Sequence, residues 1–501
     1  MANLEAGAAI PAGQGRDRFG RIETRGIDMI PEVERRAKPS SLFSVFFGPQ
    51  FGYGNMLFGA LPIAFGLGWW AAFASITVGV AIGSLVFLGI SPLSPRTGTN
   101  TQVSSGIAFG VRGRLLGSGI TWFIAVGFFI ILIYTSGQAV IETFHRWWGT
   151  PTGDGVLSLA MFGVMLVTVL VAVLGHATVE KGVRGINVLA IIMVVILFAV
   201  FASKFHAVHG GHYLLGGFWP TWFLATTTTA SLPISWGPFV GDYGRYVPSS
   251  TPSRVTSAYA IGGIFSGCWI ALTAAAFVST AFVQQAGNFT TGITAAAPAW
   301  FLLPLLIIPG LASNVASAAM TLYNAALDIS SWPAFLKLQR WHIAAGFGLL
   351  LFGLTYVFVV ATNFLSNLEA FVTIMIVTAT PWMVIVGVEF VRSRQIHPVD
   401  LHAFAIPGAK GRYWFSNGFN IRAIVAWACG VAAGLMFSTT SLFTGPAEPI
   451  VSGVDISWLV AAVVGGAVYL ALRAVPSPAA APAAPFGAAT DTAEVAAGGP
   501  I

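Results

Sequence analysis

Apolar runs about twenty residues long alternate with short polar links along most of the chain, and a run of that length forms a helix that crosses a bilayer. The pattern predicts an all-α polytopic membrane protein with twelve transmembrane helices. The predicted spans are 45–67, 69–90, 120–142, 156–176, 186–203, 220–241, 257–283, 300–327, 342–362, 367–391, 422–440 and 455–474.

Two of these spans, the first and the sixth, contain residues that break helices. The stretch 46–55 holds three glycines, a proline and two amides, and the stretch 231–238 holds two prolines and a glycine. Unwound backbone at membrane depth persists only where it is buried in protein or lines a cavity. The breaks lie five spans apart, and this odd offset inverts the second unit, as in transporters with paired broken helices. The alternative is that Gly and Pro serve only close helix packing.

Positive charge is distributed unequally over the links. All but two of the 24 Lys and Arg residues lie in the tails or in even-numbered links, and the exceptions are Arg146 and Lys204. Cytoplasmic loops collect positive charge, so the asymmetry predicts an integral cytoplasmic-membrane protein with both termini in the cytoplasm. With 56% hydrophobic and 8% charged residues, the composition excludes an ordinary soluble protein. The net charge of +6 is assigned to the membrane boundary, so no nucleic-acid partner is predicted.

Two polar side chains share a face of the third span. Tyr134 and Gln138 are four residues apart, which places them on one side of a helix. A ring beside an amide suits a planar heterocycle, because the ring stacks while the amide pairs with a polar edge. Contacts between neighbouring helices are an equally good explanation of this pair.

Further polar residues lie at the breaks and on the eighth span. Asn55 stands at the first break, and Ser235 and Trp236 stand at the second, where the indole can cover a flat ligand; a role as an interfacial anchor is the alternative for Trp236. Asn314 presents a donor and an acceptor together. Its neighbours Ser313 and Ser317 are one turn apart, and their hydroxyl oxygens suit a hard cation. The alternative is that these hydroxyls only donate hydrogen bonds to carbonyls of their own helix.

Charged residues in the spans are few. Asp242 and Arg245 have helical spacing and are predicted to pair, in a gating or structural role, at the cytoplasmic end of the sixth span. Glu369, near the outer end of the tenth span, is a weaker candidate for proton coupling. His206, His209 and His212 lie in a Gly-rich link without nearby carboxylates or cysteines, so we expect a solvated loop there and not a metal site.

Several motifs together resemble one family of transporters. They are 94–98 (Ser-Pro-Arg-Thr-Gly), 102–103 (Gln-Val), 109–110 (Phe-Gly), 236–248 at the end of the sixth span, and 310–323 on the eighth. Over residues 40–475 the chain resembles nucleobase–cation symporter family 1, in its purine/cytosine permease branch. The resemblance implies a symporter that imports a nucleobase or related heterocycle, such as cytosine, a purine, uracil, hydantoin or allantoin, by alternating access, driven by H⁺ or Na⁺.

The resemblance also implies roles for individual residues. The aromatic position of the third span matches Tyr134, where the family more often has Trp, and the amide one turn on matches Gln138. The amide of the eighth span matches Asn314, and the polar position of the first span matches Asn55.

In the sixth span, the resemblance places Pro233 or Trp236 against the substrate, with Ser235 beside them. The predicted cation site comprises Gly54, Ser313 and Ser317. Sodium-coupled members carry paired hydroxyl residues on the eighth span, whereas the matching pair here is Ala316-Ser317. One hydroxyl is missing, which raises the odds of proton coupling.

The fold implied by the resemblance is a five-plus-five inverted repeat like that of the leucine transporter, followed by two helices. The expected parts are an N-terminal cytoplasmic tail (1–40), a first repeat (41–205), a second repeat (206–395), two additional helices (396–475) and a disordered cytoplasmic tail (476–501).

Three other functions remain alternatives. The same fold can carry an amino acid or an amine; the carboxylate of an amino acid would favour helix N-termini and small residues over aromatic walls. A channel needs a continuous pore, and paired broken helices argue against it. An enzyme is not predicted, because no nucleophile–base set or metal cluster occurs in the spans. No cofactor and no obligate protein partner are expected; the predicted partners are a small heterocyclic substrate and the lipid bilayer.

Overall fold

The protein is built from helices, and no strand occurs in the part of the chain that the structure describes. The computed structural model describes residues 26–173, 176–330, 332, 340–360, 364–393, 395–403, 410–440, 443–451 and 453–475. The predicted C-terminal tail and most of the predicted N-terminal tail lie outside these residues.

The helices of the first half are α2 (Ser40–Phe47), α3 (Tyr53–Ala64), α4 (Trp69–Ser84), α5 (Phe87–Ile90), α6 (Leu93–Thr97), α7 (Thr101–Ser104), α8 (Gly106–Phe109), α9 (Leu115–Trp148), α10 (Asp154–Val173) and α11 (His176–Phe201). Those that follow are α12 (Phe218–Trp236), α13 (Val240–Gly244), α14 (Ser253–Ser279), α15 (Phe289–Ala296), α16 (Leu302–Leu305), α17 (Asn314–Ser330), α18 (Arg340–Val360), α19 (Phe364–Arg392), α20 (Pro398–Leu401), α21 (Ile421–Met436) and α22 (Ser457–Ala474).

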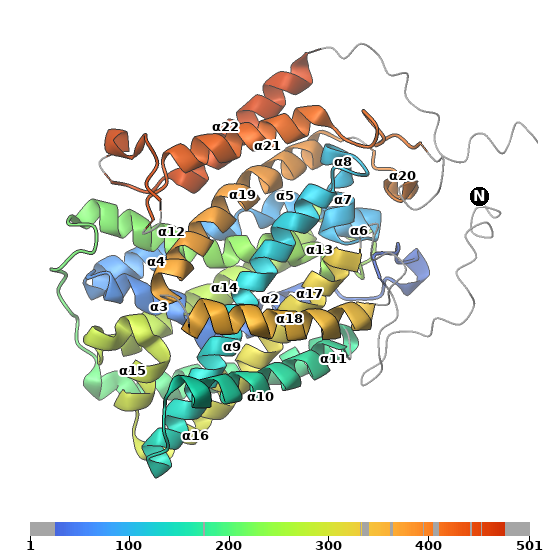
Figure 1. Ribbon diagram of the computed structural model, residues 1–501. Helices are drawn as coiled ribbons and strands as arrows, with labels where there is room; N and C mark the ends of the chain where they lie inside the picture. Colours follow the sequence, from blue (N-terminus) through green and yellow to red (C-terminus); the bar gives the residue numbers. More distant parts are fainter. Residues whose placement is uncertain are drawn as a thin grey trace, which may run out of the picture.

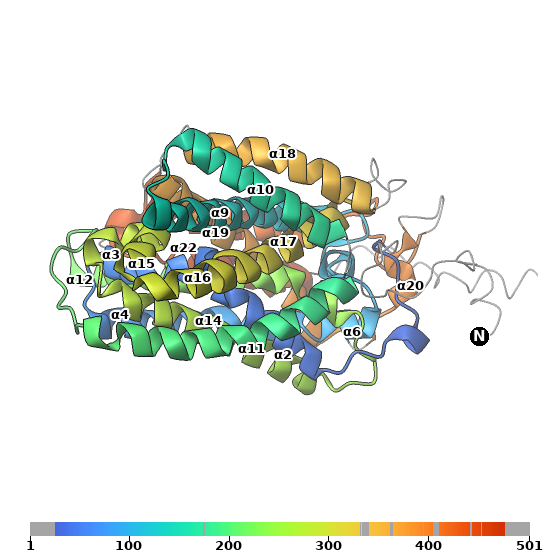
Figure 2. The same cartoon turned by 90° about the horizontal axis from the view of Figure 1, so that it is seen from below.

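The long helices lie side by side in one bundle (Figure 1 and Figure 2). The last two, α21 and α22, pack on each other and against α19 at one edge of the bundle. Within the described residues, eight helices are long and apolar enough to cross a membrane, and two apolar helices, His342–Val357 and Ile421–Met436, are shorter. The first predicted span is absent from both sets because it is divided between the short helices α2 and α3. The sixth is absent although α12 has 19 residues, because its threonines, serines and prolines make it less apolar. The total of twelve spans stays a prediction.

The first predicted span is broken where the sequence indicates. Helix α2 ends at Phe47, a 3-10 turn covers Gly48–Phe51, and α3 begins at Tyr53. Gly52, between them, is extended, with ψ of 151°. A side chain at Gly52 would meet Asn314, whose Oδ1 would lie 2.2 Å from the added Cβ. Gly52 is therefore required by the close approach of α17.

The sixth span is broken after Pro233 and not at it. Helix α12 continues through Pro233 to Trp236, a 3-10 turn covers Gly237–Phe239, and the short α13 follows. The link after the second span satisfies backbone groups near this break. The Gly241 N–H donates to Thr101 Oγ1 (2.8 Å), and Gln102 Nε2 donates to the Pro238 carbonyl (3.2 Å).

The links gather at two opposite ends of the bundle, as the charge pattern predicts. One end holds α6, α7, α8, α13 and α20, which lie in or beside even-numbered links, and α15 lies at the other end (Figure 1). The two exceptional cations, Arg146 and Lys204, both donate to carbonyl groups at the C-terminus of α15, at Thr294 (3.0 Å) and Ala296 respectively. Cations are favoured at a helix C-terminus, so a local contact explains both departures.

The segment that precedes α2 is bound to the end of the bundle that holds α6 and α13. The Ile30 N–H donates to Gly98 O (2.8 Å), and the Ala37 N–H donates to Tyr246 O (3.0 Å). Arg35 Nη1 donates to Pro95 O (3.1 Å). This N-terminal strap, residues 26–38, therefore joins the link after the second span to the end of the sixth.

Close contacts through glycine hold the broken span in the bundle, and they can be tested by substitution. A Cβ at Gly59 of α3 would lie 2.2 Å from the Leu272 carbonyl oxygen and 2.5 Å from its Cα in α14, whereas Gly163 of α10 has no atom within 4 Å of that position. We expect Gly59→Ala to lower the free energy of unfolding by about 1–3 kcal/mol, because the backbones must separate. Gly163→Ala is the matched control and should leave stability unchanged or raise it. Thermal unfolding in detergent measures both, and equal melting temperatures would contradict the assigned packing.

Candidate functional site

A small cavity lies between the two broken spans. Its lining comprises Asn55 of α3, Phe128 of α9, Ser235 and Trp236 of α12, Phe239 of the second break, and Ser317 and Thr321 of α17. Its free volume is about 10 Å³, roughly the space for one water molecule. None of these lining side chains is charged. The lining therefore combines aromatic faces with hydroxyl and amide groups.

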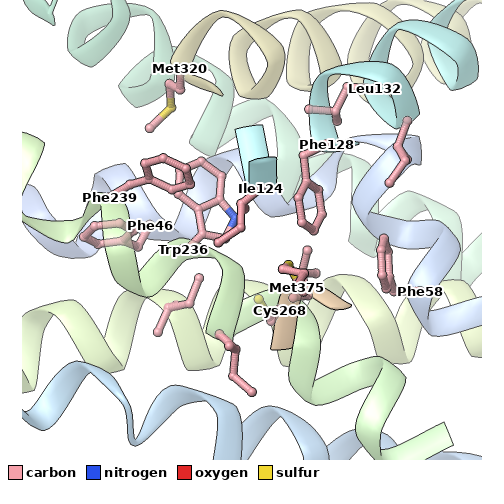
Figure 3. Packing of buried hydrophobic residues seen from close by; sticks show 14 of the residues in the cluster. Phe46, Phe58, Ile124, Phe128, Leu132, Trp236, Phe239, Cys268, Met320 and Met375 are labelled. Carbon is pink, nitrogen blue, oxygen red and sulfur yellow. The ribbon is translucent and has the colours of Figure 1, made fainter. Parts of the chain in front are cut away.

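The aromatic residues of the lining belong to two groups of packed rings; Figure 3 shows Trp236, Phe46 and Phe239 in one and Phe128 and Phe58 in the other. On one side, the Trp236 ring meets Phe46 edge-on at 6.1 Å between centroids and Phe239 at 6.4 Å. On the other, Phe128 stacks on Phe58 at 5.8 Å and meets Phe371 of α19 edge-on at 5.7 Å. Trp236 is 5% exposed and Phe46 is fully buried. These two groups close the cavity in this conformation.

Most polar side chains of the cavity donate a hydrogen bond to a backbone carbonyl nearby in the sequence. Asn55 Nδ2 donates to the carbonyl of Pro49 (2.8 Å) in the first break, and the Ser235 hydroxyl donates to Leu232 O (2.6 Å). The Thr321 hydroxyl donates to the Ser317 carbonyl (2.9 Å). Ser317 differs, because its buried hydroxyl oxygen has no hydrogen-bond partner among the described residues.

Asn314 joins three parts of the bundle and does not line the cavity. Its Oδ1 accepts the Gly54 N–H of α3 (3.1 Å), and its Nδ2 donates to the hydroxyls of Thr135 (2.9 Å) and Ser136 (3.1 Å) of α9. The residue is fully buried. Its amide therefore supplies the acceptor for a backbone N–H that the first break leaves without a helical partner.

Tyr134 and Gln138 contact each other, as their spacing predicts. Gln138 Nε2 donates to the Tyr134 hydroxyl (2.6 Å), and both side chains are half-buried. Neither lines the cavity. Pro233, which also lies outside the lining, packs in α12 against Gly83 of α4. The substrate roles assigned to Tyr134, Gln138, Pro233 and Asn314 stay predictions.

The predicted cation residues are Gly54 in α3, Ser313 at the end of the π-helical segment Leu306–Ser313, and Ser317 in α17. Ser313 and Ser317 are both buried, and the hydroxyl oxygens of both lack a hydrogen-bond partner in the described part of the chain. The Gly54 N–H is bound to Asn314. Glu369, the candidate for proton coupling, lines a separate cavity of about 20 Å³ together with Asp455. Which of these groups binds an ion stays a prediction.

The predicted pair of Asp242 and Arg245 is not formed. Helix α13 ends at Gly244 and Arg245 is its C-cap residue; the hydrogen bonds of its guanidinium go to other groups. It donates to Gly26 O (2.8 Å) and to the Tyr323 hydroxyl (3.3 Å), and no described contact joins it to the Asp242 carboxylate. Arg245 thus ties the N-terminal strap and the end of the sixth span to α17. The gating or structural role of both residues stays a prediction.

The sequence predictions missed three residues that line the cavity, namely Phe128, Phe239 and Thr321. Thr321 lies seven residues after Asn314, on the same face of α17 two turns away. Phe239 lies three residues after Trp236, beyond the second break. Phe128 is one of many aromatic residues in the third span and carried no distinguishing signal.

Comparison with known proteins identifies the family. Residues 29–461 match the family model described as "Permease for cytosine/purines, uracil, thiamine, allantoin". The chain belongs to this family. The prediction of the nucleobase–cation symporter family is therefore confirmed, and the chain is a membrane permease and not an enzyme.

Individual relatives agree with this assignment. The permease is 25% identical over 460 residues to the putative purine-cytosine permease YxlA of Bacillus subtilis (strain 168), a match that covers 90% of this chain and 96% of that protein. Among solved structures, it resembles Mhp1, a nucleobase-cation-symport-1 family transporter in a closed conformation with bromovinylhydantoin bound, with a TM-score of 0.66, 15% identity, and coverage of 91% of this chain and 95% of that chain.

It also resembles a Na⁺-coupled sialic acid symporter in a substrate-bound outward-open state, with a TM-score of 0.58, 13% identity, and coverage of 89% of this chain and 92% of that chain. At these identities, the structural matches establish the fold. The predicted transporter fold is therefore confirmed.

The position of Asn314 separates a structural role from a role in substrate binding. We expect Asn314→Ala to lower the free energy of unfolding of the substrate-free permease by about 1–3 kcal/mol, because the buried Gly54 N–H loses its acceptor. Gln138→Ala loses one hydrogen bond on a half-buried face and should change stability much less. Thermal unfolding without substrate tests this difference. A stable Asn314→Ala protein that loses only substrate affinity would support the binding role and contradict the structural one.

Proposed function

We propose that this permease imports a neutral nucleobase or a related heterocycle, such as cytosine, a purine, uracil, hydantoin or allantoin, together with a cation. The observation that carries the proposal is the cavity between the broken spans, which is lined by Trp236, Phe128 and Phe239 and by uncharged polar groups. Aromatic faces stack on planar rings, and amides and hydroxyls pair with their edges.

The lining favours a neutral heterocycle over an amino acid or an amine. An ammonium group in the cavity would lack a counter-charge, because the lining contains no carboxylate, and an unpaired buried charge is strongly unfavourable. The aromatic groups on both sides of the cavity also argue against a channel, which needs a continuous water-filled path.

Transport requires the cavity to open and enlarge. Its free volume of about 10 Å³ is far below the roughly 300 Å³ or more of ordinary ligand pockets. The two aromatic groups meet the cavity from opposite sides, one through α2 and the second break, the other through α3, α9 and α19. Separation of either group in turn provides alternating access.

The coupling cation is H⁺ or Na⁺. The unpartnered hydroxyl oxygens of Ser313 and Ser317 support a cation position on α17 beside the first break, where oxygen ligands suit Na⁺. Ala316 next to Ser317 leaves a single hydroxyl in that pair, which favours a proton.

We further propose that the membrane is the cytoplasmic one, with both termini in the cytoplasm, so that the end holding the N-terminal strap faces inward. The bias of Lys and Arg toward the links at this end supports this orientation. The proposed inverted repeats are 41–205 and 206–395, followed by helices within 396–475. The breaks at Gly48–Phe51 and Gly237–Phe239, one in the first predicted span of each repeat, support this division.

Trp236 and Trp219 provide a matched test on one helix, since Trp236 is 5% exposed beside the cavity and Trp219 is 62% exposed at the start of α12. In proteoliposomes, we expect Trp236→Ala to raise the KM for the best heterocycle by up to about tenfold, because stacking on an aromatic ring is lost. Trp236→Phe should recover part of the affinity, and Trp219→Ala should not change it.

The measurement is counterflow of radiolabelled cytosine, uracil, hypoxanthine, hydantoin and allantoin into vesicles loaded with the unlabelled compound. Equal kinetics of the two Trp→Ala variants would remove Trp236 from the site. Absence of counterflow with all five compounds in the wild-type permease would refute the substrate class.

A further inference from the structure

Two buried acids from distant parts of the sequence meet at the end of the bundle that holds the N-terminal strap. Asp242 lies in α13, and Asp328 lies in the last turn of α17. Both are fully buried, and their two helices are in contact here, because the Tyr243 hydroxyl of α13 donates to Asn324 Oδ1 of α17 (3.3 Å), one turn before Asp328. The charges of the two acids therefore act on each other. Neither acid belongs to the cavity lining.

The two carboxyl groups accept no hydrogen bond with normal geometry from the residues that the structure describes, although the Thr121 hydroxyl lies close to Asp328. Within the described part of the chain, none of the four carboxylate oxygens of Asp242 and Asp328 has a hydrogen-bond partner. Neighbouring donors are directed elsewhere. The Tyr243 hydroxyl donates to Asn324 Oδ1 (3.3 Å), and the Thr121 hydroxyl donates to its own helix at Gly117 O (3.0 Å).

Positive charge lies near both acids without touching them. Arg245 acts electrostatically on Asp242, and Arg114, at the start of α9, acts on Asp328. Arg245 donates to the strap and to Tyr323, and Arg114 Nε donates to Val111 O (3.0 Å). Other charged and titratable groups lie at this end, on the described parts of α13, α17 and the elements packed against them. Those around the acids are Arg114, Arg245, Tyr243 and Tyr323, whereas Arg96 and His342 are exposed.

A polar stripe on α17 connects the acids to the cavity. Ser317, Thr321, Asn324 and Asp328 follow one another at spacings of four, three and four residues, which places them on one face of the helix. The first two line the cavity. Asn324 Nδ2 is buried and lacks a partner among the described residues. The stripe therefore runs from the candidate substrate site to Asp328.

A buried carboxylate without donors is costly, and binding a proton removes its charge. Two carboxylates close together also resist ionising at the same time. Building on the proposed transport function, we propose that Asp242 and Asp328 together bind the coupling proton. One proton resides on a carboxyl oxygen of the pair while this end of the bundle is closed.

Opening of this end releases the proton. Separation of α13 from α17 frees Arg245 from Tyr323 and admits water, so the carboxylates gain donors and the O–H bond dissociates to the solvent. The closed and open states thus differ in proton affinity. A coupling ion can shift the equilibrium between two states only through such a difference. Because the stripe reaches the cavity, the same movement of α17 affects both the substrate and the proton.

The first test observes the proton directly and needs no substrate. Infrared difference spectra of the purified full-length permease between alkaline and acidic buffer should show the C=O stretching band of a protonated carboxyl group. Asp242→Asn and Asp328→Asn should each alter or remove this band. Asp400→Asn is the control, because Asp400 of α20 is a buried acid away from both cavities whose Oδ2 already accepts the Arg412 N–H (3.1 Å); this variant should keep the band of the pair. If the band survives in both test variants, the pair does not bind the proton.

The second test separates coupling from substrate binding. For one proton per substrate, an inward gradient of about one pH unit supports up to about tenfold accumulation. Wild-type vesicles should show it, with internal acidification, and an Na⁺ gradient alone should not drive accumulation. Asp242→Asn and Asp328→Asn should lose accumulation and acidification while retaining counterflow, and Asp400→Asn should retain all three.

Two results overturn the proposal: proton-driven accumulation in both test variants, or sodium-driven accumulation without acidification in the wild type. The absence of wild-type counterflow with every heterocycle is a different result. It refutes the proposed substrate class, and the infrared band then still decides whether the acids bind a proton.

Discussion

The arrangement of this permease depends on how the unwound backbone of its two broken spans is satisfied inside the membrane. A lipid environment offers no water to free N–H and C=O groups, so protein groups must replace the missing helical partners. At the first break, Asn314 accepts the Gly54 N–H and Asn55 donates to the Pro49 carbonyl. At the second, Thr101 and Gln102 bind backbone groups on either side of the turn. Each break is thus anchored to one particular neighbour, and these anchors determine which helices border the cavity.

The same constraint gives a physical reason for the sequence motifs. Gln102 belongs to the link motif on which the family resemblance partly rests, and its amide donates to Pro238 O, within the motif at the end of the sixth span. The two motifs are far apart in sequence and meet at one hydrogen bond. Gly52 and Gly241 are required on the other side of these contacts, because a Cβ at either position would overlap Asn314 or Thr101. The motifs therefore preserve the anchoring of the breaks as well as any contact with substrate.

The sequence predicted the helical class, the family and the position of the first break, because hydrophobic length and helix-breaking residues are local signals. It predicted less well to which side of a helix an individual side chain points and how far along the helix axis it lies relative to the cavity. Tyr134 and Phe128 differ by six residues, so they point about 120° apart on α9, and only the packing decides which direction meets the cavity. Asn314 and Thr321 share a face of α17 but differ by about 10 Å along it, so helical spacing alone does not tell which of them lies beside the cavity. The meeting of Asp242 with Asp328 depends on tertiary packing, which helical spacing alone does not encode.

Helix α17 carries three different tasks along its length. Asn314 holds the first break, Ser317 and Thr321 line the cavity, and Asp328 faces Asp242 at the end of the sixth span. A helix is stiff over this distance, so a tilt or rotation of α17 relative to α3 and α13 changes all three levels together. Coupling between sites requires an element with discrete arrangements that both sites bias. The backbone hydrogen bonds of α17, uninterrupted from Asn314 to Ser330, provide that element, because they transmit a displacement at the cavity to the buried acids without any change in the helix itself.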